Sequence, residues 1–432
     1  MSTTQIFYAS TLYGVTTLAA ALDSGCFGPA DRRLLLVGNN AAVPETTPSP
    51  AEMPGFERLR GRFDGVLSWN EAISPLHPSG WTPRADDLPM LERHLRLLWG
   101  LGDDRVELVV ESVQVAPALT IARLFSEAPL DVYADGLMSY GPTRNKIDPL
   151  VGERVRRLLH LDLVPGLAPL LLAEFGATAE VVPAEAFTKV VAELADSAAE
   201  EDGPALLLGQ YLAALSLLTP AEEEELHVRM VRGAIARGHR SLVFKPHPTA
   251  PDAWTRRLAE EAAALGAELT VLDRPVLAEV VYRELRPALV VGCFSTALMT
   301  ARAFYGIPVA RVGTRTVLDR LTPYQNSNRV PLTLVDALVP DLEGAAVEAP
   351  DDEALAGLVA AVGFAMQPKV RGDLRGAATR HLSGPLAERT RHYFTRRRLT
   401  VLGLPGGIPV PRHPRVRRLA RRALRLKRAL AR

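Results

Sequence analysis

The sequence predicts an α/β protein made of two doubly wound, Rossmann-like domains with a cleft between them. Short apolar, β-rich runs alternate with longer helical patterns, which is typical of parallel sheets covered by helices on both faces. The alternation is interrupted once, between residues 184 and 204, where the pattern becomes polar and helical. A chain of 432 residues is also long enough for two cores of about 150 to 200 residues each.

The strands expected before the interruption are buried apolar runs. They span residues 6–9, 34–37, 65–69, 106–110, 130–133, 159–163 and 179–182. Helices of crossover length are expected between them, for example at 16–22 and 91–98. The proline-rich segments 45–54 and 73–89 are predicted to be loops, and their length favours a role in shaping a substrate site.

After the interruption the alternation resumes. Strands are expected at 205–208, 242–244, 269–272, 289–291 and 307–312. One of the intervening helices begins near Thr219, which can cap it, with Pro220 and several acids in its first turn. The predicted domains therefore cover residues 1–190 and 204–388, followed by a basic tail at 389–432.

The composition favours a cytoplasmic protein. Cys26 and Cys293 lie in unrelated contexts, so neither a disulfide framework nor a structural zinc site is expected. No basic segment precedes the first apolar run, so no signal peptide is predicted. The best apolar run, 106–125, is broken by polar residues and a proline, so no membrane span is predicted.

Three short motifs each follow an apolar run. Segment 130–136 (LDVYADG) ends with the carboxylate of Asp135 beside a glycine. Segment 242–248 (LVFKPHP) leaves a strand with His247 between two prolines, and segment 290–296 (VVGCFST) offers adjacent hydroxyls where a strand turns into a helix. Ligands of open α/β sheets bind outside the carboxyl ends of the strands, which is where all three motifs fall.

Each motif has a chemical interpretation and an ordinary structural one. Asp135 can take a proton from an acceptor hydroxyl, although Asp-Gly is also a common turn. His247 can donate a hydrogen bond to a departing phosphate, although prolines around a loop histidine can simply end a strand. Ser295 and Thr296 can form an anion site at a helix N-terminus or a plain N-cap. Glu279 can accept hydrogen bonds from ribose hydroxyls, although a solvated helix glutamate is the commoner outcome.

The order and spacing of the motifs suit the transfer of a sugar from an activated nucleotide sugar. Two successive doubly wound domains joined by a single linker are the layout of a GT-B glycosyltransferase, whose active site lies in the cleft. No Asp-x-Asp sequence stands at an expected strand end, so a metal-dependent transferase of the other common fold is not supported, and no metal site is predicted.

At these residues the sequence resembles a known family. Segments 133–136 (YADG), 245–248 (KPHP) and 294–296 (FST) are similar to the acidic-glycine, His-Pro and paired-hydroxyl motifs of bacterial sialyltransferases. The surrounding pattern looks most like the bacterial α-2,8-polysialyltransferase family, over roughly residues 4–315. In one departure, Ala134 stands where the family's first motif usually carries the first of two acids.

The resemblance implies an inverting, metal-independent transfer from CMP-sialic acid to a hydroxyl of an acceptor glycan, in surface or capsule polysaccharide synthesis. The N-terminal domain would lie on the acceptor side and the C-terminal domain would bind the nucleotide sugar. Asp135 would be the general base, and His247 would stabilise or protonate the leaving phosphate. The donor-binding residues would be Lys245, Pro248, Glu279, Ser295, Thr296 and Gly136, with Arg144 a further candidate counter-charge.

Two alternatives stay open at this point, and no cofactor is expected beyond the donor substrate. The protein could be a GT-B transferase that uses another nucleotide sugar. It could instead be a catalytically silent nucleotide-sugar-binding protein of capsule assembly, which the substitution at Ala134 makes plausible.

The tail differs sharply in charge from the rest of the chain. Of 50 lysines and arginines, 15 follow Glu388 and no acid does, so the preceding part keeps 35 basic against 49 acidic residues. Residues 415–432 place apolar side chains along one helical stripe among arginines. Such a helix fits the anionic inner face of the cell membrane as a peripheral anchor. Docking on the acidic body is the main alternative, and nucleic acid is not expected because residues 415–432 include no aromatic residue.

Overall fold

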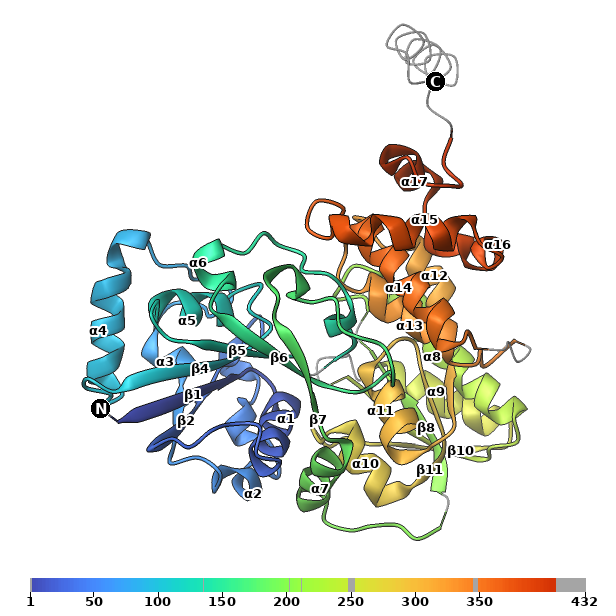
Figure 1. Ribbon diagram of the computed structural model, residues 1–432. Coiled ribbons are helices and arrows are strands. Elements are labelled where there is room, and N and C mark those ends of the chain that lie inside the picture. Colours follow the sequence, from blue (N-terminus) through green and yellow to red (C-terminus); the bar gives the residue numbers. More distant parts are fainter. Residues whose placement is uncertain are drawn as a thin grey trace, which may run out of the picture.

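The computed structural model describes residues 2–134, 136–201, 203–210, 212–247, 253–344 and 349–408. Asp135, Pro248 and the predicted amphipathic helix of the tail, at 415–432, therefore lie outside the described residues. Within them, the chain forms two halves, each built around a parallel sheet, which lie side by side (Figure 1). No helix among the described residues is both long and apolar enough to cross a membrane.

The first sheet has the strand order β3-β2-β1-β4-β5-β6-β7. Its strands are β1 (Thr3–Ala9), β2 (Arg32–Val37), β3 (Gly65–Ser68), β4 (Arg105–Glu111), β5 (Leu130–Ala134), β6 (Val155–Leu161) and β7 (Thr178–Val182). The helices of this half are α1 (Leu12–Asp23), α2 (Phe56–Arg60), α3 (Trp69–Ala72), α4 (Leu88–Leu98), α5 (Ala118–Leu124), α6 (Pro149–Gly152) and α7 (Ala184–Leu194).

Alternation along the strands sends side chains to two separate apolar layers. Phe7 of β1 packs in the layer covered by α1, α2 and α7, whereas its neighbours Ile6 and Tyr8 pack in the layer covered by α3, α4 and α5. Both faces of the sheet are therefore buried, as expected for parallel strands with near-continuous apolar runs.

The second sheet has the order β10-β9-β8-β11-β12, and its neighbouring strands are again parallel. Its strands are β8 (Gly203–Leu208), β9 (Ser241–Lys245), β10 (Glu268–Val271), β11 (Pro287–Gly292) and β12 (Val309–Arg311). Its helices are α8 (Pro220–Ala236), α9 (Ala253–Ala264), α10 (Ala278–Leu285), α11 (Thr296–Tyr305), α12 (Thr314–Arg320) and α13 (Arg329–Leu338). Thr219 and Glu222 form the capping box expected at the start of α8.

The predicted fold class is confirmed: two doubly wound α/β units make up the GT-B architecture. The strand expected at 159–163 was placed too late, because β6 begins at Val155. The charged residues Arg156 and Arg157 interrupt the apolar pattern in the first half of this strand. Both form ion pairs with the buried Asp131 of β5 at 2.9 Å. The predicted loops 45–54 and 73–89 contain short 3-10 turns at Pro50–Glu52 and Ala85–Asp87.

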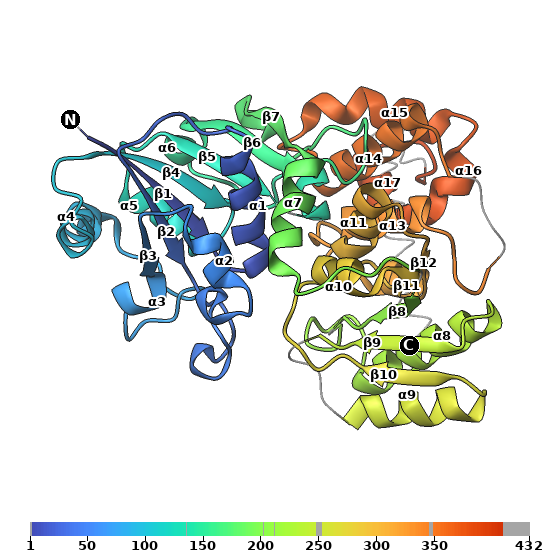
Figure 2. The ribbon, with the colours of Figure 1, turned by 90° about the horizontal axis from the view of Figure 1, so that it is seen from below.

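The two halves are joined by more than the linker. Helix α7 packs against α1 of the first half and against α10 and α11 of the second, and it lies between them in Figure 2. The remaining helices, α14 (Asp352–Met366), α15 (Arg375–Ser383), α16 (Ala387–Thr390) and α17 (Arg396–Leu402), stand over the second half in Figure 1.

These C-terminal helices also reach loops of the first half. Gln367 donates to the carbonyl oxygen of Arg144 at 2.5 Å, and Arg371 donates to that of Leu170 at 3.1 Å. The loops that follow β5 and β6 are therefore held by chain that is far away in the sequence. The domain limits 1–190, 204–388 and 389–432 stay predictions, because both halves share these contacts.

Each sheet has one topological switch point, where consecutive crossovers run in opposite directions. In the first sheet it lies between β1 and β4, and in the second between β8 and β11. The carboxyl ends of these strands leave a crevice that serves as the ligand site in open α/β sheets. The residues at these four strand ends are therefore where a binding site is expected.

Candidate active site

A cavity of about 860 Å³ opens between the carboxyl ends of the two sheets. Five of the predicted site residues line it, and they come from both halves: Gly136, His247, Glu279, Ser295 and Thr296. Asp135 lies outside the described residues, but Ala134 and Gly136 on either side of it both line the cavity. Lys245 is a predicted site residue that does not line the cavity, and Pro248 lies outside the described residues.

The paired-hydroxyl motif forms the N-terminus of α11. Ser295 is the N-cap of this helix, and its hydroxyl accepts a hydrogen bond from the backbone N–H of Ala297 at 3.2 Å. The N-cap interpretation is therefore correct, and the anion-site interpretation stays a prediction for a helix end that lines the cavity. A helix N-terminus with hydroxyls beside it is suited to an anion, because its amides and dipole favour negative charge.

Thr296 lies against the first half of the molecule. Its hydroxyl oxygen accepts from the backbone N–H of Leu137 at 3.5 Å. A Cβ atom added at Gly136 would lie only 3.0 Å from the same oxygen. Gly136 has an extended backbone, so it is the close approach between the halves, rather than an unusual φ angle, that favours glycine here.

Glu279 is not the solvated helix glutamate that is common at such positions. It lies in the first turn of α10 and is only 2% exposed. Thr300 of α11 donates to its Oε1 at 2.6 Å, and burial raises the pKa of the carboxyl group, against the opposing effects of Thr300 and of the Lys245 charge. A buried carboxylate that lines the cavity suits hydroxyl donors such as those of a ribose.

Lys245 is the last residue of β9, and His247 follows it after Pro246. Burial lowers the pKa of the Lys245 ammonium, and the nearby Glu279 carboxylate opposes this effect. Burial also lowers the pKa of His247, and the positive charge of Lys245 adds to it. His247 is therefore neutral near neutral pH. A phosphate in the cavity could accept a hydrogen bond from its imidazole N–H, and the positive charge of Lys245 nearby would favour this contact.

The loop after β8 supplies residues that the sequence analysis missed. Gln210 accepts a hydrogen bond from the backbone N–H of Phe294 at 2.8 Å, which ties the ends of β8 and β11 across the switch point. Glu223 of α8 turns inward and accepts from the N–H groups of Leu212 and Ala213, both at 2.7 Å. Its position among the acids of the helix start gave no sign of this role.

The opposite wall has a matching tie across its own switch point, also missed. Glu111, the last residue of β4, accepts from the hydroxyl of Ser10 at 2.7 Å and from its N–H at 3.0 Å. Glu111 lines the cavity together with Tyr8 and Asn40. The available signal was an acid directly after an apolar run, the same signal that singled out Asp135.

Arg144 also reaches the cavity from the first half. Burial lowers the pKa of its guanidinium group, and no acid opposes this effect. Within the described part of the chain, this guanidinium makes no hydrogen bond or ion pair; the loop is held instead by the backbone N–H of Arg144, which donates to Gln114 at 2.6 Å. A half-buried cation of this kind is suited to an anionic group of a ligand.

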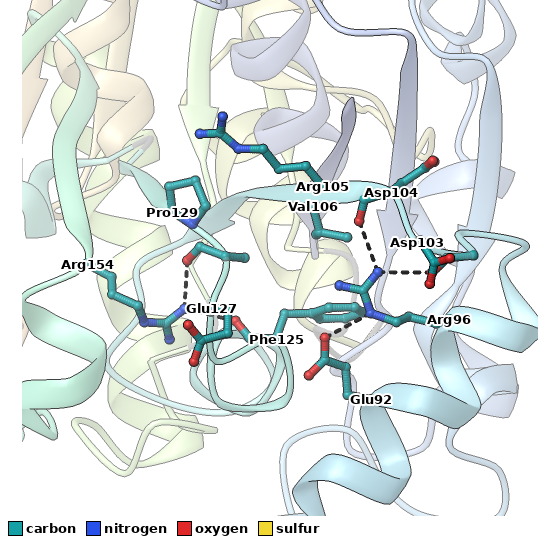
Figure 3. Close-up of a pocket in the computed structure, with 12 residues that line it drawn as sticks. Glu92, Arg96, Asp103, Asp104, Arg105, Val106, Phe125, Glu127, Pro129 and Arg154 are labelled. Atoms are coloured by element: carbon teal, nitrogen blue, oxygen red, sulfur yellow. Dashed lines mark hydrogen bonds and ion pairs between the residues drawn. The ribbon is translucent and has the colours of Figure 1, made fainter. Parts of the chain in front are cut away.

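A second cavity, of about 750 Å³, lies at the opposite edge of the first sheet, beside the first residues of β4 (Figure 3). Its cations already have partners. Arg96 donates to Glu92 and to two backbone carbonyls, and Arg154 donates to the carbonyls of Phe125 and Ala128. These bonds hold loops at the amino ends of the strands, whereas ligands of open α/β sheets bind at the carboxyl ends.

No group of three or more His, Cys, Asp or Glu side chains able to hold a metal ion occurs among the residues that the structure describes. The groups that the cavity presents to a ligand are instead N–H donors and hydroxyls on the second half, with carboxylates on both halves. That combination fits a ligand with one anionic part and several hydroxyls, such as a nucleotide sugar.

The fold and this cleft define a glycosyltransferase of GT-B architecture. The chain belongs to the alpha-2,8-polysialyltransferase family, whose model matches residues 5–314. The expected family is thereby confirmed, and the matched segment contains every predicted catalytic and donor-binding residue. No curated protein sequence matches the chain.

Several solved structures show a distant similarity. Apo UGT2 of Phytolacca americana is 11% identical, with 90% of this chain and 98% of that chain covered and a TM-score of 0.41. MurG of Acinetobacter baumannii is 14% identical, with 90% and 100% covered and a TM-score of 0.40. E. coli heptosyltransferase WaaC is 15% identical, with 72% and 88% covered and a TM-score of 0.38. At such low scores these similarities add nothing to the description of the fold, which rests on the two sheets.

Proposed function

We propose that this glycosyltransferase transfers sialic acid from CMP-sialic acid to a hydroxyl of an acceptor glycan, with inversion and without a metal ion. The observation that carries the proposal is the convergence of the family's motifs on one cavity. His247, Glu279, Ser295 and Thr296 line its second-half wall, and Ala134 and Gly136, which flank Asp135, line the other.

In this proposal the donor phosphate binds at the N-terminus of α11, between the Ser295 and Thr296 hydroxyls and the His247 imidazole. The ribose hydroxyls donate to Glu279, which Thr300 holds in place. Arg144, on the opposite wall, is a counter-charge for the carboxylate of the donor sugar. Pro248 would limit the freedom of the His247 backbone, because its ring disfavours helical geometry in the preceding residue.

The reaction is a single displacement. Asp135 takes the proton of the acceptor hydroxyl as its oxygen bonds to the anomeric carbon, and the bond from that carbon to the phosphate oxygen breaks. CMP leaves with the electron pair. Negative charge develops on the phosphate, so donors already aimed at it, from His247 and the start of α11, lower the barrier most.

The test is to incubate the purified full-length protein with CMP-sialic acid and a panel of neutral and sialylated oligosaccharides, with and without EDTA. Mass spectrometry should detect products heavier by one sialic acid in both conditions, and NMR should show an inverted anomeric configuration. Transfer from a uridine or guanosine diphosphate sugar alone would contradict the proposed donor. Loss of transfer in EDTA would contradict the absence of a metal requirement.

A further inference from the structure

Arg144 is held in place by its backbone and not by its side chain. Its N–H donates to the side chain of Gln114 at 2.6 Å, and its carbonyl oxygen accepts from the side chain of Gln367 at 2.5 Å. In the part of the chain that the structure describes, its guanidinium group forms neither a hydrogen bond nor an ion pair, and burial lowers its pKa without an opposing acid. The protein therefore fixes the position of this residue and leaves its charged group available to a ligand.

The two glutamines that hold Arg144 come from different parts of the molecule. Gln114 lies in the loop between β4 and α5, in the same half as Arg144. Gln367 directly follows α14, one of the helices that stand over the second half in Figure 1, and it is 223 residues further along the chain than Arg144. It also lies outside the segment that the family model matches. The contact therefore links the C-terminal region of the chain to a wall of the cavity.

Gln367 lies on a firmly packed part of the chain. The last turn of α14 is buried, and Arg398 donates to two carbonyl oxygens of that turn, at 2.6 and 3.1 Å. A Cβ atom added at Gly363 would lie only 2.6 Å from the side chain of Leu170, so the helix closely approaches the loops of the first half. Because this part of the chain has little freedom to move, Gln367 is able to hold a partner in one place.

Two cavities share Arg144. It lines the active-site cavity, and it also lines a side cavity of about 770 Å³, which Gln325 and Gln367 line as well. A loop residue that borders open space on two sides has few packing contacts to fix its orientation. The hydrogen bond from Gln367 supplies a constraint that packing does not.

This constraint matters because of the way a guanidinium group binds a carboxylate. The group uses two parallel N–H donors, so its orientation decides how well it binds. If the backbone of Arg144 were mobile, the ligand would have to order the loop on binding, and its affinity would be lower. The two glutamine contacts order the loop during folding, before a ligand arrives.

We propose that Gln367 is a positioning residue that acts through Arg144 and sets the affinity of the cavity for the carboxylate of the donor sugar. The inference rests on the proposed function, because it takes that carboxylate as the partner of Arg144. It assigns no contact with the donor to Gln367 itself. A purely structural role, in which Gln367 only joins α14 to the first half, predicts that CMP and CMP-sialic acid lose affinity equally when Gln367 is replaced.

The test compares CMP, which lacks the carboxylate, with a CMP-sialic acid that carries fluorine beside the anomeric carbon and is therefore not transferred. Gln367→Met keeps the length of the side chain and removes its donor, whereas Gln367→His keeps an N–H donor. Arg144→Ala removes the guanidinium group. Gln325→Met is the matched control, because Gln325 lines the same side cavity, whereas the hydrogen bond to the Arg144 carbonyl oxygen comes from Gln367.

Calorimetric titration should show that Arg144→Ala weakens binding of the fluorinated donor by about tenfold to a hundredfold, as expected for losing a charge-assisted contact with a carboxylate. Gln367→Met should weaken it by about threefold to tenfold, while the affinity for CMP changes by less than about twofold. Gln367→His should recover most of the loss, and Gln325→Met should behave as the wild type. Retained CMP binding shows that each variant is folded, and Gln367→Ala provides the same comparison if Gln367→Met does not fold.

The double variant Arg144→Ala/Gln367→Met shows whether Gln367 acts through Arg144. Once the guanidinium group is absent, removing the glutamine should weaken binding no further, because the effects of residues that act through one contact are not additive. Additive losses, equal losses for CMP and the fluorinated donor, or no loss in Gln367→Met would overturn the inference and leave the proposed function standing. A wild-type protein that binds neither CMP nor the fluorinated donor would contradict the proposed function, and the inference with it.

Discussion

The two walls of the cleft both join two strand ends at a topological switch point, but they do so with different side chains. Each has a switch point at which a side chain ties two parallel strand ends together: Glu111 to Ser10 in the first half, and Gln210 to Phe294 in the second. The first wall uses a carboxylate as the acceptor, and Ala134 and Gly136, which flank Asp135 in the sequence, line the same wall. The second wall uses a neutral amide, followed by a capped helix N-terminus.

This difference separates the tasks of the halves. A wall with carboxylates attracts hydroxyls and can take a proton, whereas a helix N-terminus with Lys245 behind it attracts phosphate. Each wall also has one exception, Arg144 on the first and Glu279 on the second. In the proposed reaction Arg144 binds the carboxylate of the donor sugar, and Glu279 binds the ribose hydroxyls of the donor nucleotide.

The largest expected effect comes from removing the proposed base. Asp135→Asn should lower turnover by about a hundredfold to ten-thousandfold, the usual range for positioned proton transfer, while stabilisation by CMP is retained. Steady-state kinetics and thermal shift measure the two quantities. Near-normal turnover would show that Asp135 is not the base.

Ala134→Asp is the companion variant, because it restores the missing acid of the family's first motif. If Asp135 carries the role alone, this variant should change turnover by less than about tenfold. A large gain would instead mean that the alanine impairs the natural protein.

On the second wall, His247→Ala should lower turnover by roughly a hundredfold, which is typical of losing one preorganised donor to a developing negative charge. The fold should remain intact, because His247 follows β9 and supports no strand pairing. Far-UV circular dichroism checks the fold. An effect confined to the KM for the acceptor would contradict a contact of His247 with the donor phosphate.

Glu279→Gln should weaken CMP binding by about tenfold, since a hydrogen bond to a charged acceptor contributes roughly 1.5 to 3 kcal/mol. The amide oxygen can still accept from Thr300, so the helix contact is retained. Thr300→Val is the matched control, because it keeps the Glu279 carboxylate but removes the hydrogen bond that Thr300 donates to it. This variant should weaken CMP binding less than Glu279→Gln does. Calorimetric titration measures both affinities, and the reverse ranking would contradict the ribose contact.

A smaller effect concerns pH. Burial and Lys245 lower the pKa of His247 in the free protein, and a bound phosphate would raise it again. The complex therefore binds more protons than the free protein, so affinity should increase a few-fold as pH falls from about 8 to about 6. A nonhydrolysable CMP-sugar analogue suits the measurement, because its phosphodiester does not titrate there. His247→Asn should abolish the pH dependence, and an unchanged slope in that variant would assign it to another group.

The smallest effect is expected from the tail. Truncation after Val410 should leave turnover of small soluble acceptors nearly unchanged but weaken binding to anionic vesicles, since each basic residue near such a surface contributes about 1 kcal/mol. The remaining chain stays anchored, because Arg398 of α17 donates to the carbonyls of Ala365 and Met366. Vesicle flotation at low and high salt measures the binding, and equal binding to neutral vesicles would rule out an electrostatic anchor.

The sequence was sufficient to predict the sheets, because fully buried parallel strands appear as apolar runs. It failed where charge entered a strand, as at the start of β6, whose arginines pair with Asp131. It also could not show that α14 and the segment after it hold loops of the first half, since an apolar helix face does not specify which surface it covers.

The same limit applies to the cleft. His247, Ser295 and Thr296 were predicted from residue type and position after a strand end, and Glu279 as a possible acceptor for ribose hydroxyls. The fold brings all four to one cavity. Glu111 and Gln210 were missed, because their importance comes from which strands are neighbours at each switch point. Likewise, the need for glycine at 136 follows only from the approach of Thr296 across the cleft.

The central claim, that the second wall binds a cytidine monophosphate donor, is tested most directly by thermal unfolding with CMP, CDP, UDP and GDP. A ligand at a hundred times its dissociation constant stabilises the folded state by about 2.7 kcal/mol, which shifts the melting temperature measurably. We expect CMP to raise the melting temperature of the wild-type protein, and to raise that of Glu279→Gln by less. Stabilisation by UDP or GDP but not by CMP would contradict the central claim.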